Sequence, residues 1–380
     1  MASHPSDIRR LSTHTFRKSL FEPAYDSPDM IYGVYAGNLY PLINDDDLEE
    51  KYWVLRRKCA IFDVPERPIE ITGPDACRYL ERIMCRPLAD LKIGRGRYAI
   101  ACTHEGGVFM DGVVFHLSEN RYWYVQADGE MDAWFAAHID GFDVTVTDPS
   151  ARVLQIQGPT SFKVMEAASD GAITWDMKYF HAGFVSLGGQ EVYVSRTGWT
   201  GELGYEVYTQ AGTDHMRLWN HLMDAGAPHG MEFATADPME TRRIEAGILD
   251  NLVDMDATMT PFAAGLGAFV NLDHPGFIGR EALLGANQDV ALYGLTCEAH
   301  PLPGAQVTRG DHAVGRITNG AWSLTLKCGV GYVRFDTAHN WIGQSLQLIQ
   351  PDGTAMPCEI CALPFFDAEK RLARGLTFEL

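Results

Sequence analysis

Two short stretches of alternating apolar and polar residues flank the most distinctive segment of the chain. Val192-Tyr193-Val194 precedes this segment and Tyr205-Glu206-Val207-Tyr208 follows it, and a period of two residues is typical of strands. Residues 195–204 between them include three glycines, which adopt turn conformations at little steric cost. The pattern predicts a β-hairpin with a tight turn and polar side chains at its bend.

Helical periodicity is found elsewhere in the chain. Leu48 to Arg57 carries apolar residues on one side and follows an acidic run that suits a helix start, and residues 131–138 and the stretch after Asp214 are also predicted to be helical. Residues 97–102 and 108–115 are predicted to be paired strands. Helices mixed with antiparallel strands indicate an α+β fold and not a doubly wound parallel sheet.

The pattern changes near the C-terminus. From about Gln288 the chain consists of short alternating stretches separated by glycine and proline turns, which predicts a separate β domain. Cys358 and Cys361 lie in one such stretch and are predicted to be structural residues of a strand, because no second pair or zinc-spaced histidine accompanies them. The thirteen histidines do not cluster at ligand spacing, so we expect no metal site.

The amino-acid composition of the chain limits the kinds of molecule that it is expected to bind. With 46% apolar residues in 380, the chain is globular, and 50 acidic against 31 basic residues give a formal charge of −19. This charge repels phosphate groups, so we expect neither nucleic acid nor an anionic membrane as partner and favour a small ligand. Met1 to Lys18 has no apolar core and no stretch approaches a membrane span, so we expect a cytoplasmic protein.

Two carboxylates are candidates for catalytic or ligand-binding residues. Asp111 and Glu206 are each flanked by apolar strand residues, and the aromatic residues Tyr98 and Trp199 occur in the same predicted strands and turns. A buried carboxylate needs hydrogen-bond donors, and a heterocycle with ring N–H and amino groups, such as a pterin, supplies two at once while its plane stacks on aromatic rings. The alternative is a buried carboxylate that accepts hydrogen bonds from backbone amides.

The predicted hairpin closely resembles a motif of the aminomethyltransferase (T-protein) family of folate enzymes, S-R-T-G-[YW]-T-G-E-x-G-[FY]-E. The resemblance extends in the family's order from about Tyr52 to Leu363 and includes Phe62-Asp63-Val64, Gly106-Gly107, Ile156-Gln-Gly-Pro159, Arg243-Ile-Glu-Ala-Gly247 and Leu363-Pro-Phe-Phe366. It implies an α+β, three-domain cloverleaf of two ferredoxin-like units plus a C-terminal β-barrel, with tetrahydrofolate in a central channel. Residues 1–285 would form the two interleaved, folate-binding subdomains and residues 286–380 the barrel.

The resemblance also implies roles for the candidate residues. Asp111 would be the catalytic carboxylate at the N5/N10 edge of the folate, Glu206 would hold the pterin, and Tyr98 and Trp199 would contact the cofactor. Two family positions differ here: Met110 replaces the first aspartate of G-G-x-x-D-D, and Met239 stands where an arginine is expected. The Y-G-N-D loop of the family reads Asn251-Leu252-Val253-Asp254.

These differences favour a tetrahydrofolate-dependent demethylase branch. The segments Gly33 to Pro41 and Val64-Pro-Glu66-Arg67 look like the dimethylsulfoniopropionate demethylases, although those enzymes usually carry S-K-Q in place of Thr200-Gly201-Glu202. The predicted function is methyl transfer from a small onium donor to N5 of tetrahydrofolate, with Tyr35, Trp199 and Tyr205 facing the cation.

Three alternatives stay open within the family. They are an aminomethyltransferase that uses a lipoyl-carrier protein, an O-demethylase of methoxy-aromatics, and a non-catalytic folate-binding module. Asp111-Gly-Val-Val-Phe115 resembles the O-demethylases. The resemblance requires no metal and leaves a homodimer open.

Overall fold

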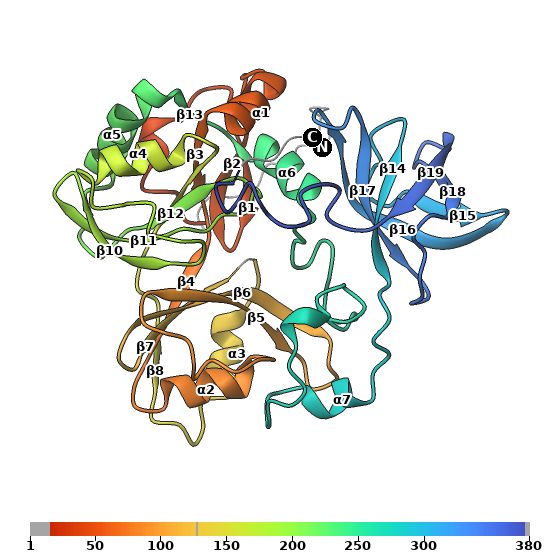
Figure 1. The fold of residues 1–380 in the computed structure, drawn as a ribbon, viewed down its shortest axis with the longest axis horizontal. Helices are drawn as coiled ribbons and strands as arrows, with labels where there is room; N and C mark the ends of the chain where they lie inside the picture. The colour runs from red at the N-terminus through yellow and green to blue at the C-terminus, as the bar shows by residue number, and fades with distance from the viewer. Residues whose placement is uncertain (1–15, 127, 377–380) are drawn as a thin grey trace.

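The computed structural model describes residues 16–126 and 128–376, and Figure 1 shows two sheet-containing units beside a barrel. The N-terminal leader considered above lies almost entirely outside the described residues. Within them, no helix is long and apolar enough to cross a membrane. The first sheet has six strands in the order β10-β11-β12-β9-β3-β13. Their bounds are Cys59–Val64 (β3), Val153–Gln157 (β9), Ala182–Leu187 (β10), Gln190–Ser195 (β11), Gly204–Tyr208 (β12) and Met231–Phe233 (β13).

The second sheet has five strands in the order β5-β6-β7-β4-β8. Their bounds are Arg67–Thr72 (β4), Arg95–Cys102 (β5), Val108–Ser118 (β6), Arg121–Gln126 (β7) and Thr145–Thr147 (β8). The chain leaves the first sheet after β3, builds the whole second sheet and returns at β9, so the two units are interleaved in sequence. This arrangement confirms the predicted α+β class.

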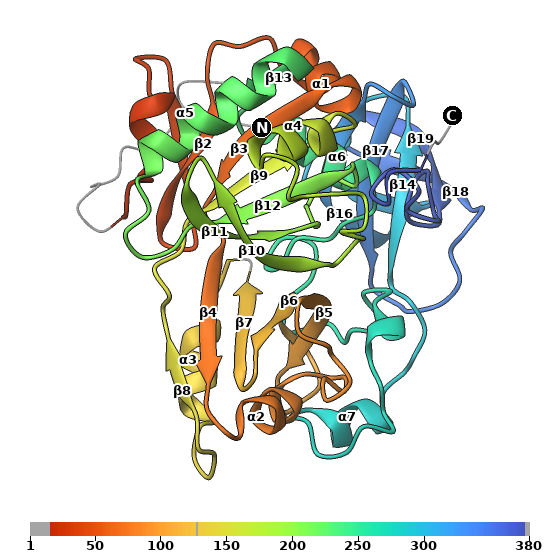
Figure 2. The ribbon, with the colours of Figure 1, turned by 60° about the vertical axis from the view of Figure 1, so that its left-hand side comes forward.

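Helices cover the outer faces of both sheets, and the inner faces meet. Apolar residues of α4 (Ser161–Ala168) and α5 (His215–Gly226) share a core with the first sheet, and α2 (Ala76–Ile83) and α3 (Met131–Ala137) share one with the second. Phe115 and Trp123 of the second sheet pack against Tyr193 and Tyr208 of the first, and Figure 2 shows the two sheets stacked in this way. Burial of apolar surface between the sheets fixes their relative position.

The C-terminal unit is a closed barrel with strand order β14-β17-β16-β15-β18-β19. The bounds are Leu292–Cys297 (β14), Gln306–Arg309 (β15), His312–Ser323 (β16), Cys328–Phe335 (β17), Ser345–Ile349 (β18) and Ala355–Cys361 (β19). The predicted β domain is therefore confirmed as a barrel, and Cys358 and Cys361 lie on β19 with no disulfide. The division at residue 285 stays a prediction.

A hairpin and three helices complete the fold. A separate hairpin pairs β1 (Ile31–Tyr35) with β2 (Asn38–Ile43). Helix α1 (Leu48–Arg57) is capped by the Asp47 carboxylate and packs on α6 (Ala236–Glu245), and the chain then passes through α7 (Arg280–Leu284) to the barrel. The bounds of α1 are those predicted from the sequence.

The predicted hairpin around residue 200 is present, but its turn is wider than expected. Strands β11 and β12 pair, with Ser195 opposite Glu206, and residues 196–203 form a loop between them. The backbone of this loop bonds to other segments: Arg196 N–H donates to the His181 carbonyl and the Leu203 carbonyl accepts from Gly158 N–H, both at 2.8 Å. These partners hold the loop open, so it is not a tight turn.

Candidate active site

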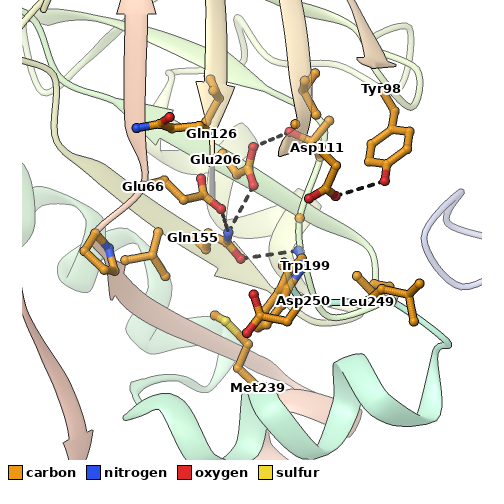
Figure 3. Close-up of a pocket in the computed structure, with 18 of the residues that line it drawn as sticks. Glu66, Tyr98, Asp111, Gln126, Gln155, Trp199, Glu206, Met239, Leu249 and Asp250 are labelled. Carbon is orange, nitrogen blue, oxygen red and sulfur yellow. Dashed lines mark hydrogen bonds between the residues drawn. The ribbon is translucent and has the colours of Figure 1, made fainter. Parts of the chain in front are cut away.

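A cavity of about 350 Å³ lies where the two sheets, the β1–β2 hairpin and α6 meet (Figure 3). This volume is within the usual range for small-molecule sites. Its wall combines aromatic rings with carboxyl groups. The polar and aromatic lining residues include Tyr35, Tyr40, Glu66, Tyr98, Asp111, Gln126, Gln155, Trp199, Glu206, Asp237, Glu240, Asp250 and Phe269.

Asp111 and Tyr98 form a hydrogen-bonded pair in this wall. Asp111 on β6 lies opposite Ile100 of β5, so Tyr98 is its diagonal neighbour on the same face, and the Tyr98 hydroxyl donates to Asp111 Oδ2 at 2.9 Å. Asp111 Oδ1 is buried without a hydrogen-bond partner. Burial raises the pKa of Asp111 to about 6 despite this hydrogen bond. The pair thus presents a weakly basic carboxylate to the cavity.

Backbone packing fixes the direction of Asp111. The following residue, Gly112, lies so close to β7 that a Cβ atom would meet the Val125 carbonyl oxygen at 2.2 Å. Only glycine therefore allows β6 and β7 to pair at this point. The ring of Phe269, in the 3₁₀ turn Gly267–Phe269, packs edge-on against Tyr98 with centroids 4.7 Å apart and restricts its rotation.

Two other carboxyl groups, those of Glu66 and Glu206, accept hydrogen bonds from the same side-chain amide of Gln155. Gln155 Nε2 on β9 donates to Glu206 Oε1 at 3.0 Å and to Glu66 Oε1 at 3.1 Å. Glu206 Oε2 also accepts hydrogen bonds from Thr197 at 2.5 Å and Tyr208 at 2.6 Å. Burial raises the pKa of both carboxyl groups. Glu66 Oε2 has no partner and is buried, so this oxygen is available to a ligand donor.

Trp199 lies between these groups and α6. Its backbone N–H donates to Gln155 Oε1 at 3.4 Å, and the Arg243 guanidinium lies 5.1 Å from the indole centroid. This cation–π contact orients the indole in the cavity wall. The structure therefore brings together Tyr98, Asp111, Trp199 and Glu206, the four residues proposed for cofactor contacts.

The two other predicted donor-binding residues have different positions. Tyr35 lines the cavity from the β1–β2 hairpin, whose turn is anchored by a 2.9 Å hydrogen bond from Ala36 N–H to Asp128. Tyr205 does not line it and is 0% exposed in the core beneath α4 and α5. Because successive residues on a strand point to opposite faces, Glu206 and Tyr205 cannot both face the cavity. The structure therefore places Tyr205 outside the cavity wall and does not support its predicted role as a ligand contact.

Carboxyl groups greatly outnumber cations in the cavity wall. The side chains of Glu66, Asp111, Glu206, Asp237, Glu240 and Asp250 all line it, and Lys370 is the one basic lining residue in the described part of the chain. Of these six carboxyl groups, Glu240 alone belongs to an ion pair found among the described residues. The family's arginine position is occupied by Met239, which lines the cavity without charge. A cationic ligand would balance this surplus.

Four of these six acidic side chains, Glu66, Asp237, Glu240 and Asp250, were not predicted as site residues from the sequence. Asp237 on α6 and Asp250 in the loop after it each have a buried Oδ1 without a hydrogen-bond partner. Burial is the main cause that raises the pKa of Asp237 to about 6 and that of Asp250 to about 8. Glu66 and Gln155 were likewise missed as site residues; Glu66 lies in a stretch that resembles the demethylases, but neither spacing nor periodicity places it beside Glu206.

Two buried residues of α6, Arg242 and Glu245, have a structural role. The buried Arg242 guanidinium pairs with Glu202 at 2.9 Å and with Glu245, and Glu245 accepts hydrogen bonds from Tyr52 at 2.9 Å and Ser323 at 2.6 Å. Ser323 belongs to the barrel, so this network ties α6 to the C-terminal unit and holds one wall of the cavity in place.

The fold and site define an α+β enzyme with an enclosed, carboxyl-lined cavity for a small organic ligand. In the described residues no group of three or more histidine, cysteine, aspartate or glutamate side chains is placed to hold a metal ion. The free Glu66 Oε2 beside Gln155 fits a ring N–H or amino group of a pterin, and Trp199 offers the ring an aromatic face.

Comparison with known proteins identifies the family. The GCVT N-terminal domain family matches residues 31–274, and the glycine cleavage T-protein C-terminal barrel domain matches residues 291–367. The chain is 32% identical to an aminomethyltransferase of Streptomyces avermitilis, over 88% of this chain and 94% of that protein. It is 35% identical to one of Cutibacterium acnes, over 93% of this chain and 99% of that protein.

A solved structure supports the fold. The glycine cleavage system aminomethyltransferase T from Bartonella henselae aligns with a TM-score of 0.82 and 22% identity over 92% of this chain and 98% of that one. The chain belongs to the glycine cleavage T-protein (aminomethyltransferase) family. Members of this family are enzymes that transfer one-carbon units with tetrahydrofolate, which assigns this chain to tetrahydrofolate-dependent one-carbon transfer.

Proposed function

We propose that this enzyme transfers a methyl group from a small onium donor, such as dimethylsulfoniopropionate, to N5 of tetrahydrofolate. The observation that carries the proposal is the surplus of carboxyl groups in the cavity wall, five of which lie outside every ion pair found among the described residues. Burial raises the pKa of all five carboxyl groups, so their ionisation is costly, and a bound sulfonium or quaternary ammonium ion would offset that cost. The aromatic lining offers favourable cation–π contacts to the same ion.

The reaction needs mainly positioning. The donor's carbon–sulfur or carbon–nitrogen bond breaks and leaves its electron pair on a neutral sulfide or amine, the methyl carbon bonds to N5, and the N5 proton is lost. A neutral leaving group needs no protonation, so in-line approach supplies most of the acceleration. Asp111, which is ionised at neutral pH, would accept the N5 proton, and Tyr98 would hold its carboxylate in position.

The tetrahydrofolate itself would be held by the opposite part of the cavity. Glu66 and Glu206 would accept hydrogen bonds from the amino and N–H groups of the pterin, Gln155 would keep the two carboxyl groups together, and Trp199 would stack on the ring. These are the contacts that the free oxygen of Glu66 and the lining position of Trp199 support.

A second candidate is aminomethyl transfer from a lipoyl-carrier arm, which is favoured by the names of the relatives in Streptomyces avermitilis and Cutibacterium acnes. That reaction releases ammonia and forms 5,10-methylenetetrahydrofolate. It requires docking of a carrier protein, and the formal charge of −19 offers no general attraction for an acidic one.

One experiment separates these candidates. Tetrahydrofolate is incubated anaerobically with the enzyme and dimethylsulfoniopropionate, glycine betaine, dimethylglycine, a methoxybenzoate or an aminomethyl-lipoyl carrier, and the folate products are identified by mass spectrometry. We expect 5-methyltetrahydrofolate with an onium donor and a strongly reduced amount with Asp111→Asn. A methylene product with the carrier alone would establish the aminomethyltransferase, and folate binding without any product would indicate a binding module.

A further inference from the structure

We propose that Asp250 is the counter-ion for the cationic centre of the donor, with Tyr35 and Tyr40 as the aromatic walls beside it. This inference rests on the proposed function, because it assigns the end of the cavity that receives the onium group. It also explains why an acidic side chain occupies a buried position without a partner.

The first argument is the position of the side chain. Asp250 lines the cavity from the loop after α6 and is seen beside Trp199 and Met239 in Figure 3. Its Oδ1 is buried and has no hydrogen-bond partner. A buried polar atom without a partner is destabilising, so its presence in a cavity wall points to a bound ligand group.

The second argument is that the backbone holds Asp250 rigidly. Its N–H donates to Asp254 Oδ2 at 2.9 Å and its carbonyl accepts from Asp254 N–H at 2.9 Å. Leu252 N–H closes the same loop by donating to the Met255 carbonyl at 2.8 Å. Because the loop is fixed before a ligand binds, the carboxyl group is preorganised.

The third argument is the local charge balance. Arg243 is the nearby cation, but it pairs with both Glu240, at 2.5 Å, and Asp254. One guanidinium therefore pairs with two carboxylates and forms no ion pair with Asp250, although its charge still opposes the rise in the pKa of Asp250. Asp237 at the start of α6 and Asp111 on β6 also line the cavity, and neither forms an ion pair among the described residues. Within the described residues the cavity wall therefore has more carboxyl groups than cations, and a bound cation would favour their ionised form.

Two tyrosines of the β1–β2 hairpin complete this end of the cavity. Tyr35 and Tyr40 both line it, and their ring centroids are 6.1 Å apart. Burial is the main cause that raises their pKa values, and Asp250 contributes to both shifts. An onium ion between these rings and the carboxylate would have cation–π contacts and a charge partner. It has no N–H or O–H to donate, so the recognition must be electrostatic.

Burial and the surrounding charges determine how Asp250 titrates. The charged groups facing it are Arg243 and Glu240 from α6, Asp254 from its own loop and Asp111 from β6, with Tyr35 and Tyr40 on the hairpin. Burial raises its pKa to about 8, the nearby carboxylates add to the shift, and Arg243 opposes it. Asp250 is therefore mostly protonated at pH 7, and an onium ion would drive the release of its proton.

Calorimetry with trimethylsulfonium as the probe tests this assignment directly. At pH 7, in two buffers of different ionisation enthalpy, we expect the wild type to bind the probe with release of about one proton. Asp250→Asn, which keeps the shape, should bind it at least tenfold more weakly without proton release and retain its tetrahydrofolate affinity. Asp256→Asn, outside the cavity lining, is the matched control and should behave as the wild type.

The results of this experiment distinguish failure of the Asp250 assignment from failure of the proposed function. Equal probe binding by Asp250→Asn, or no binding by the wild type, would overturn the assignment. Neutral tert-butanol, of similar size, should show no dependence on Asp250. If the probe binds through Asp250 but no donor methylates tetrahydrofolate, the proposed function fails and the cation site stands. If methyl transfer occurs and the donor KM of Asp250→Asn is unchanged, the function stands and the site fails.

Discussion

Replacement of Asp111 by asparagine should lower activity and raise stability at the same time. Asparagine retains the shape of the side chain and an oxygen that accepts the Tyr98 hydrogen bond, but it cannot accept a proton. Loss of a positioned general base typically reduces turnover by about 100- to 10,000-fold. Folate affinity should change by less than about threefold, because the binding contacts stay in place.

The stability change follows from the pKa shift. Burial raises the pKa of Asp111 from 3.8 to about 6, so the folded protein holds this proton more tightly than the unfolded chain. Ionising the folded protein at neutral pH therefore costs up to roughly 3 kcal/mol of stability, at about 1.4 kcal/mol per pKa unit. This cost is absent below pH 3.8 and fully present above about pH 6, and the asparagine variant should not have it.

Two assays check this reasoning. The urea midpoint at pH 7.5 should rise in Asp111→Asn, and the difference from wild type should shrink as pH falls through the range between about 6 and 3.8. In wild type, kcat/KM should increase with pH through about 6, and the residual activity of the variant should lack that step. Unchanged turnover, or a variant less stable than wild type at pH 7.5, would refute the assigned role and environment of Asp111.

Three further substitutions test other parts of the structure. Glu206→Ala should weaken tetrahydrofolate binding by about 1 to 3 kcal/mol, since ligand donors lose their acceptor, and unaltered affinity in calorimetry would count against the contact. Tyr205→Phe should leave the KM values for donor and folate unchanged, because the ring lies in the core; a large increase would restore it to the site. Arg242→Ala should lower the unfolding free energy by about 3 to 5 kcal/mol, since Glu202 and Glu245 lose their buried partner, and a denaturant midpoint equal to wild type would contradict this.

The strand positions of the two carboxylates Asp111 and Glu206 could be predicted from the sequence. Alternation placed Asp111 and Glu206 on strands, and both carboxylates face the cavity in the structure. The alternation could not say which side of β12 faces the ligand, because both Tyr205 and Glu206 are buried. The prediction therefore placed both in the site, although neighbours on a strand point to opposite faces.

The α+β class, the C-terminal β domain and the presence of acidic residues within apolar strands could all be predicted without the structure, because they depend on local periodicity and composition. Tertiary structure alone decided which acids share the cavity. Glu66 and Glu206 meet through Gln155, and Asp250 forms no ion pair among the described residues because Arg243 pairs with Glu240 and Asp254. These contacts join segments far apart in sequence, and their positions follow from strand register and sheet packing, which local patterns do not encode.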